Sequence, residues 1–206
     1  MDKKILFLCF FIGMTTFSSA QRIKVDKKKL AFLKNETKVG VQLVLSDNFE
    51  VHGGFTEEAY LVDKKRNLAK KGGEKRVERW ELQYNEAKKK TWKKDFLNEI
   101  NNRLTKYSNL SFTSDNEGVN YILRIEMDWV YFGYDTFRSG PHEEAKLQVT
   151  LKFIQTGNPE IEVYSTQTPH IIGESARGEF TDILRVGKCY SKLGFLLELQ
   201  LKRILK

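Results

Sequence analysis

The chain of 206 residues lacks an apolar run of membrane-spanning length. A transmembrane helix needs about 20 apolar residues, and the longest run here, residues 5–14, has about half that number. Two lysines precede this run and Ser-Ser-Ala follows it at residues 18–20, which is the order of parts in a secretory signal peptide. We therefore predict a signal peptide over residues 1–20, cleaved near Ala20/Gln21. The mature chain is then exported, periplasmic or secreted, soluble, and without a membrane span.

Cysteine is almost absent. The predicted signal peptide contains Cys9, so Cys189 is the single thiol of the mature chain and no intramolecular disulfide can form. Stability must come from packing, and residues 21–206 have a length that suits one domain. Cys9 lies inside the apolar run, which argues against a lipid-modified N-terminus. Cys189 flanks a predicted apolar helix stripe, so core packing is the favoured interpretation and a nucleophile is the alternative.

The motifs of common catalytic sites are also missing. Residues 72–75 read Gly-Gly-Glu-Lys but lack the spacing of a phosphate-binding loop, and neither a dinucleotide-binding glycine pattern nor a Gly-x-Ser-x-Gly turn occurs. A zinc-protease helix starting at His142 would need a second histidine where Lys146 stands. We therefore predict no metal, no cofactor and no enzyme activity.

The alternative is an enzyme site assembled from dispersed residues. Glu126 and Asp128 share one face of a predicted strand with Arg124, so the two carboxylates lie about 7 Å apart, within range of acid–base chemistry. A solvated strand face with an ion pair is the ordinary explanation. Histidine would complete such a site, and the three histidines belong to different segments that meet only by folding: His52, His142 and His170.

Positive charge is concentrated in the first half of the mature chain. Lysine and arginine exceed aspartate and glutamate by nine over residues 21–106, whereas residues 107–206 have two more acidic than basic residues. We interpret residues 63–79 as a basic exposed loop or a poorly formed helix, whose cations are candidates for binding an anion or a partner. These cations are Lys64, Lys65, Arg66, Lys70, Lys71, Lys75, Arg76 and Arg79. A solvated loop without a partner is the alternative, and nucleic acid is excluded outside the cytoplasm.

Hydrophobic periodicity predicts the fold. Alternating apolar side chains indicate strands and a three-to-four spacing indicates helices. Strands are expected at residues 39–45, 49–55, 121–131, 145–153 and 161–168, and helices at about 82–107 and 182–205. The short turn between the last two strands makes them antiparallel. We predict an α+β (mixed α/β) fold with a single mostly antiparallel or mixed sheet and two long amphipathic helices, the second C-terminal.

A line of small residues lies beside the apolar stripe of the last helix, at Gly187, Ser191 and Gly194. Each helical glycine costs about 1 kcal/mol relative to alanine. Close approach of another element is the expected reason. An oligomer contact is the alternative and would make the protein a structural subunit.

The order of elements resembles the periplasmic α/β domain shared by the curli-secretion lipoprotein, the penicillin-binding-protein activator lipoprotein and related envelope proteins. The matching segments are residues 38–46, 92–104, 120–123 (Asn-Tyr-Ile-Leu), 155–158 (Gln-Thr-Gly-Asn) and the final helix. The lipid-bearing cysteine of those proteins is absent. The resemblance implies a fold and an envelope location, and no functional residue. We hypothesise a non-enzymatic exported protein that binds an envelope protein or an anionic envelope polymer.

Overall fold

The computed structural model describes residues 21–135, 142–157 and 160–206, so the predicted signal peptide lies outside the described residues. The strands are β1 (Lys38–Val51), β2 (Ser111–Thr113), β3 (Tyr121–Tyr131), β4 (Tyr134–Asp135), β5 (His142–Glu143), β6 (Lys146–Gln155), β7 (Ile161–Gln167) and β8 (Ile171–Ile172). The helices are the 3₁₀ helix η1 (Ala31–Asn35), α2 (Glu57–Gly72), α3 (Glu74–Glu86), the π-helix η2 (Ala87–Thr91), α4 (Trp92–Leu104) and α5 (Thr181–Leu205).

The main sheet has the strand order β2-β1-β3-β6-β7, and β8 adds to β6. β1 is parallel to β2 and β3, whereas β3, β6 and β7 are antiparallel in succession. The mixed sheet and the terminal hairpin of β6 and β7 confirm the prediction. β1 and β3 can run parallel because the chain between them includes α2 to α4, which is long enough for a crossover.

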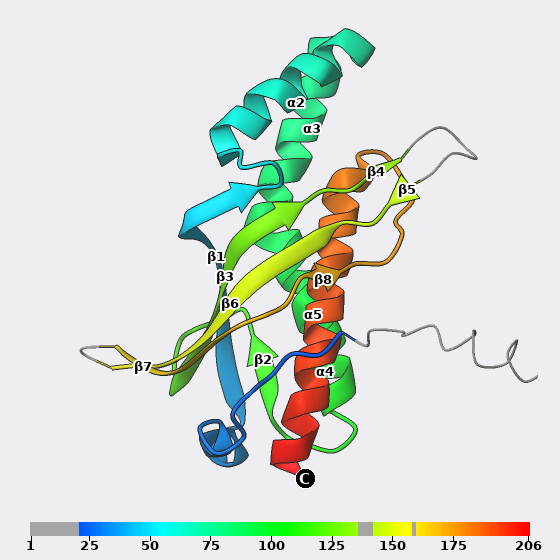
Figure 1. Ribbon diagram of the computed structural model, residues 1–206. Coiled ribbons are helices and arrows are strands. Elements are labelled where there is room, and N and C mark those ends of the chain that lie inside the picture. The colour runs from blue at the N-terminus through cyan, green and yellow to red at the C-terminus, as the bar shows by residue number, and fades with distance from the viewer. Residues whose placement is uncertain (1–20, 136–141, 158–159) are drawn as a thin grey trace, which may run out of the picture.

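Two helices form the second layer of the molecule. α4 and α5 lie side by side against one face of the sheet, behind the strands in Figure 1. Alternate side chains of β6, from Leu147 to Phe153, are buried on this side, and removal of their apolar surface from water stabilises the fold. The opposite face carries the polar side chains that alternate with them. α5 has 25 residues, yet no helix in the described ranges is both long and apolar enough to cross a bilayer.

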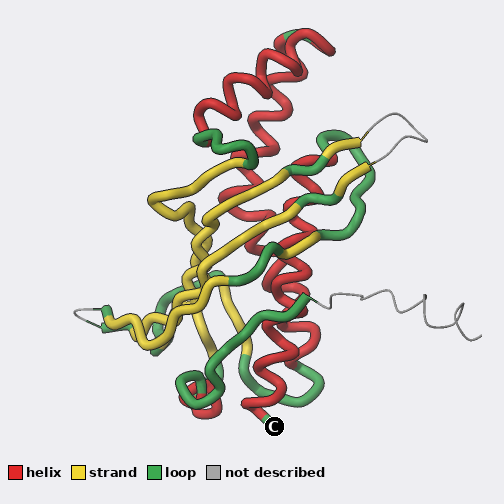
Figure 2. The backbone as a smooth tube through the Cα atoms, in the orientation of Figure 1, coloured by secondary structure: helices red, strands yellow, loops and turns green. Residues whose placement is uncertain are grey.

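α3, η2 and α4 follow one another without a break, as the tube in Figure 2 shows. Their buried side chains are spaced by three or four residues except between Ala87 and Trp92, where the spacing is five. A π turn accommodates one extra residue, so both halves present their apolar side chains to the same core. The helix expected from about residue 82 therefore begins at Glu74, and its last regular residue is Leu104.

The basic loop expected at residues 63–79 is instead a helical hairpin of α2 and α3. Thr56 caps α2 by accepting a hydrogen bond from the amide of Ala59, and Gly73, at φ 68°, turns the chain into α3. α2 buries only Leu68, so it shows almost no apolar stripe in the sequence. That is why periodicity did not predict this helix.

The two strands expected at residues 39–45 and 49–55 are one strand, β1. Its pairing with β3 shifts register between Leu45 and Glu50, which is the sign of a bulge. The turn that follows contains Gly53 and Gly54, both at positive φ, and closes with a bridge from Val51 to Phe55. The interruption that the sequence pattern suggested is therefore a bulge within β1.

Candidate functional site

The predicted cations of residues 63–79 lie on the α2–α3 hairpin, which extends beyond the end of the sheet in Figure 1. Five of the eight are engaged within the chain. Lys64 pairs with Asp182 at 2.6 Å and Arg79 with Glu179 at 3.0 Å, and Arg76 lies over the ring of Phe180. The two other pairs are Lys65 with Glu81 and Arg66 with Asp63.

The remaining three cations form the hairpin tip, which we define as residues 70–75. Lys70, Lys71 and Lys75 are exposed, and none of them forms an ion pair with a described residue. Glu74 is the single acidic side chain of the tip. The structure therefore divides the predicted set into cations that hold the hairpin and cations that face water.

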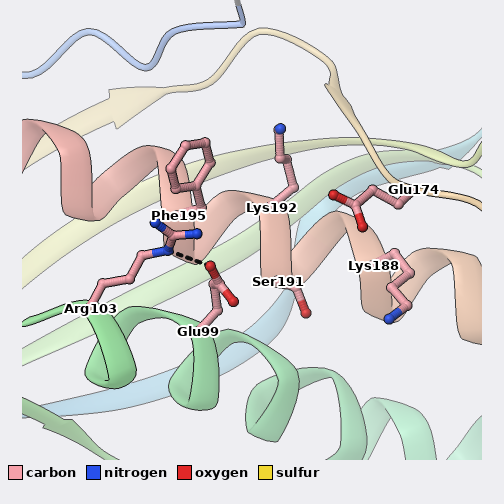
Figure 3. A pocket seen from close by; sticks show the side chains of 7 residues that line it. All are labelled: Glu99, Arg103, Glu174, Lys188, Ser191, Lys192 and Phe195. Atoms are coloured by element: carbon pink, nitrogen blue, oxygen red, sulfur yellow. Dashed lines mark hydrogen bonds and ion pairs between the residues drawn. The ribbon is translucent and has the colours of Figure 1, made fainter.

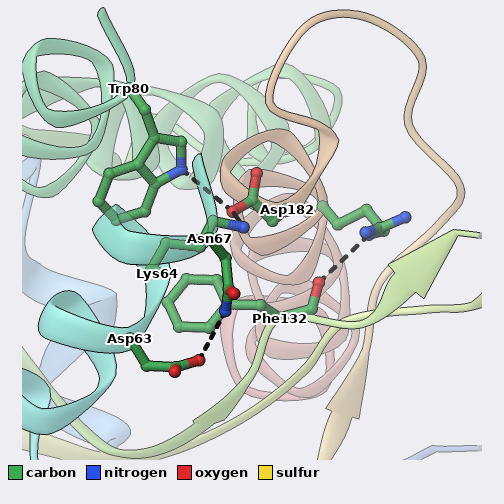
Figure 4. Close-up of polar contacts among 7 residues, drawn as sticks. Asp63, Lys64, Asn67, Trp80, Phe132 and Asp182 are labelled. Atoms are coloured by element: carbon green, nitrogen blue, oxygen red, sulfur yellow. Dashed lines mark hydrogen bonds and ion pairs between the residues drawn. The ribbon is translucent and has the colours of Figure 1, made fainter. Parts of the chain in front are cut away.

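A buried polar cluster fixes the base of the hairpin to α5 (Figure 4). The indole N–H of Trp80 donates to Asp182 Oδ2 at 3.1 Å, and the same carboxylate pairs with Lys64. Tyr60 stacks on Phe132 with ring centroids 4.6 Å apart, and burial together with the nearby Asp182 raises the pKa of Tyr60. Hydrogen-bonded charges at a buried site define a single arrangement, so the hairpin has a fixed base and a free tip.

A groove between α4 and α5 is the second cationic feature, and sequence reasoning missed it. It consists of two hollows of about 230 and 210 Å³ that share Arg103. The first hollow, shown in Figure 3, is lined by Glu99, Arg103, Glu174, Lys188, Ser191, Lys192 and Phe195. The second is lined by Arg103, Lys106, Tyr107, Glu198, Leu199, Lys202 and Lys206. We call the two together the α4–α5 groove.

The acidic side chains of the α4–α5 groove are mostly occupied. Glu99 forms an ion pair with Arg103, and Glu198 accepts a hydrogen bond of 2.7 Å from the hydroxyl of Tyr107. Burial, and then the Glu198 carboxylate, raise the pKa of Tyr107, which keeps it a donor at neutral pH. Glu174 is exposed and makes no ion pair with a described residue. Cationic groups therefore dominate what the groove offers to a ligand.

The lysines of the groove are held by aromatic rings. Lys192 lies 5.0 Å from the ring centroid of Phe195, and Arg103 covers the same ring at 4.2 Å. Lys202 and Lys206 both lie over Tyr107, at 5.7 and 5.4 Å. Such cation–π contacts restrict the positions of the charged groups without neutralising them. No sequence signal predicts this groove, because α4 and α5 are distant in the chain and meet only through packing.

The strand face that carries Glu126 and Asp128 gives a different result. Glu126 pairs with Lys152 at 2.8 Å, while Asp128 accepts hydrogen bonds from Thr150 at 2.8 Å and Gln167 at 3.1 Å. Both carboxylates are thus engaged on the polar face of the sheet. This is the ion-paired face that was the ordinary explanation for them.

Two of the three histidines do meet, around Trp129. His170 stacks on the indole with ring centroids 4.5 Å apart, and His52 meets it edge-on at 5.6 Å. The side chain of His142 lies outside the described residues. In the described ranges, no three metal-ligating side chains are grouped closely enough to hold an ion.

Cys189 is fully buried, and its thiol donates to the carbonyl of Ala145 at 3.2 Å. Burial raises the pKa of this thiol to about 12, so the nucleophilic thiolate is scarce at neutral pH. The structure supports core packing for this residue.

The line of small residues faces α4. A Cβ added to Gly194 would lie 2.9 Å from the carbonyl oxygen of Phe96, and one added to Gly187 would meet the carboxylate of Asp95. Close approach of another element is therefore the reason for both glycines, and the element belongs to the same chain. An oligomer contact is not needed to explain them.

Comparison with known protein families, curated proteins and solved structures returned no match. The resemblance to the envelope lipoproteins stays a prediction. What the structure defines is an α+β domain with two helices on one sheet face, a projecting helical hairpin and a cationic groove between its long helices.

Proposed function

We propose that this protein is an exported, non-enzymatic binding protein that recognises an anionic component of the cell envelope through the tip of its helical hairpin. The observation that carries the proposal is the division of the eight hairpin cations. Five are engaged at its base and flanks, whereas Lys70, Lys71 and Lys75 project without counterions among the described residues.

The physical reason is that an unneutralised cluster attracts anions before contact. Exposed charges attract oppositely charged groups over about 8–10 Å at physiological salt. The tip extends beyond the sheet, so such groups can approach it. Lys70 and Lys71 lie in the last turn of α2, where the helix dipole favours cations, but Lys75 lies in the first turn of α3, where a cation is unfavourable and repels the other two. An anionic partner would relieve that repulsion.

The test compares two variants with equal loss of charge. One replaces Lys70, Lys71 and Lys75 with glutamine. The control replaces Lys27, Lys28 and Lys29, which are also exposed and lie at the opposite end of the molecule from the hairpin. Each lysine near an anionic surface contributes about 1 kcal/mol, so sedimentation with isolated envelope membranes and wall material should weaken at least about tenfold for the tip variant.

The control variant should bind within about twofold of the unchanged protein, since its charges lie at the opposite end of the molecule from the tip in Figure 1 and screening limits their reach to about 8–10 Å. Equal weakening of both variants would show attraction by net charge alone. If the unchanged protein does not sediment with any envelope fraction, the proposal is wrong.

A protein partner is the second form of this binding function. The outer side of α2 has an open apolar hollow of about 810 Å³, where Phe55 and Val62 are 54% and 68% exposed. Exposed apolar side chains grouped in this way mark protein contacts. If the partner is a protein, Val62→Asp should reduce sedimentation with the envelope fraction as strongly as the tip variant does.

A further inference from the structure

We infer that the α4–α5 groove is a binding site for a linear phosphate-bearing polymer, with one phosphate seated in the first hollow between Lys188, Lys192 and Arg103. This site is separate from the hairpin tip, and the inference does not depend on the tip being a binding element.

The shape of the groove favours a chain over a discrete small molecule. Pockets that enclose a small ligand have about 300–1,000 Å³, and each hollow is smaller than that, at about 230 and 210 Å³. Arg103 lines both hollows, and their lining residues follow α5 from Lys188 to Lys206, which is about 27 Å of helix. A polymer lying along the groove would occupy both hollows with successive units.

The charges of the groove favour an anion. Lys188 and Lys192 are one helical turn apart, and both line the first hollow together with Ser191. Neither lysine forms an ion pair with a described residue, although Asp95 lies close enough to Lys188 for the ammonium to oppose the rise that burial causes in the pKa of Asp95. Of the two acids lining this hollow, Glu99 is already paired with Arg103 and Glu174 is exposed.

Helix stability explains only part of this arrangement. The negative end of the α5 dipole accounts for Lys202 and Lys206, which lie in or next to its last turn. The effect fades beyond the last turn, so it gives no reason for Lys188 and Lys192. Both lysines line the first hollow, and Arg103 borders it from α4, beside Phe195 and paired with Glu99 in Figure 3.

Phosphate suits the groove better than the carboxylates of an acidic peptide. Lysine acts as a compact point charge and arginine as a planar fork, and the two together bind the several oxygens of a phosphate. An amphipathic peptide would need an apolar surface, but Arg103 and Lys192 cover the ring of Phe195. The groove therefore offers charge rather than apolar area.

The experiment measures binding of linear polyphosphate of about 10 units, too short to reach the hairpin tip as well, to the purified protein by calorimetry at about 50 and 200 mM salt, where screening differs. The variant Lys188→Gln with Lys192→Gln removes both unpaired cations of the first hollow and keeps helix propensity nearly constant. We expect the Kd to rise about tenfold or more and the salt dependence to become shallower. The urea midpoint of each variant checks that the fold is kept.

Two control variants separate this inference from the proposed function. Lys70→Gln with Lys71→Gln removes equal charge at the hairpin tip, which lies at the far end of the α3–α4 stretch from the groove, and should change the Kd less than about twofold because those charges are screened at that distance. The triple tip variant should keep polyphosphate binding. If the tip variant loses polyphosphate binding and the groove variant keeps it, the groove inference fails and the hairpin proposal stands.

The ligand class is tested by competition. Poly-glutamate of matched charge should compete at least about tenfold less well than polyphosphate, since it lacks the clustered oxygens that arginine and lysine share. Equal competition would overturn the assignment to phosphate. Equal weakening by the groove variant and by the Lys70, Lys71 control would overturn the site itself.

Discussion

We predict opposite effects on the free energy of unfolding when each of two glycines of α5, Gly187 and Gly194, is replaced by alanine. A Cβ on Gly194 would lie 2.9 Å from the carbonyl oxygen of Phe96 and 3.3 Å from the amide nitrogen of Ile100, and both of these are backbone atoms of α4. A Cβ on Gly187 would instead meet the carboxylate of Asp95, which can turn away about its own side-chain bonds. The backbone at Gly194 has no such freedom, so α4 and α5 would have to separate.

The magnitudes follow from two opposing effects. Alanine gains about 1 kcal/mol over glycine in a helix, and this gain is the same at both positions. Overpacking a close contact costs about 1–3 kcal/mol, and we assign that cost to Gly194→Ala alone. Gly187→Ala should then raise the free energy of unfolding by up to about 1 kcal/mol, and should exceed Gly194→Ala by about 1–3 kcal/mol.

Urea denaturation followed by far-ultraviolet circular dichroism measures both values, provided that the m-values agree. Trp92 gives a second signal, because its indole N–H donates to the carbonyl of Ile183 across the same helix pair at 3.1 Å. Its fluorescence should change in Gly194→Ala and in Gly187→Ala as well, because a Cβ on Gly187 would lie 3.6 Å from the indole ring. The unfolding free energies are therefore what separate the two variants. Equal stabilities, or a more stable Gly194→Ala, would refute the close approach of α4 and α5.

The base of the hairpin and the buried thiol give two further predictions. Asp182→Ala should cost about 2–3 kcal/mol in urea denaturation, because it leaves the Trp80 N–H unpaired, and Lys64→Met should cost at least as much, since it leaves the buried Asp182 carboxylate without its cation; a negligible loss in Lys64→Met would contradict this. Cys189 has a pKa raised to about 12 by burial, so Ellman's reagent at pH 8 should label it only after denaturation. Above the unfolded thiol pKa of about 8.5, only the unfolded chain releases this proton, so stability should fall as pH rises.

Much of the fold could be predicted from sequence because some elements bury one face only. β3, β6 and α5 each have a sharp boundary between apolar and polar sides, and their predicted limits lie within two residues of those observed. α2 has no such boundary, since it buries Leu68 alone and is stabilised by its caps and by α3. A helix that contacts the rest of the molecule along so little of its length shows no hydrophobic periodicity in its sequence.

The candidate sites were predicted less completely, for a different reason. A run of basic residues is visible in the sequence, so the hairpin cations were found, but which of them have counterions depends on Asp182 and Glu179, about a hundred positions away. The α4–α5 groove was hidden altogether. Residues 107–206 have a slightly negative net charge, because their many acidic residues, which lie largely on strands and loops, outnumber the basic ones. This net charge gave no indication that lysines of α5 gather in the groove beside α4.

The two cationic surfaces share one structural support. α3, η2 and α4 run without a break from Glu74, at the hairpin tip, to Leu104, beside Arg103 of the groove. At 1.5 Å per residue this stretch is about 45 Å long. Because the base of the hairpin is fixed to α5 by Asp182 and Trp80, the distance between the tip and the groove is set by the fold. A short polyphosphate cannot reach both surfaces, whereas a longer anionic polymer can. Binding at one surface would then raise the effective concentration of the polymer at the other, so affinity should increase steeply once the polymer exceeds about 45 Å.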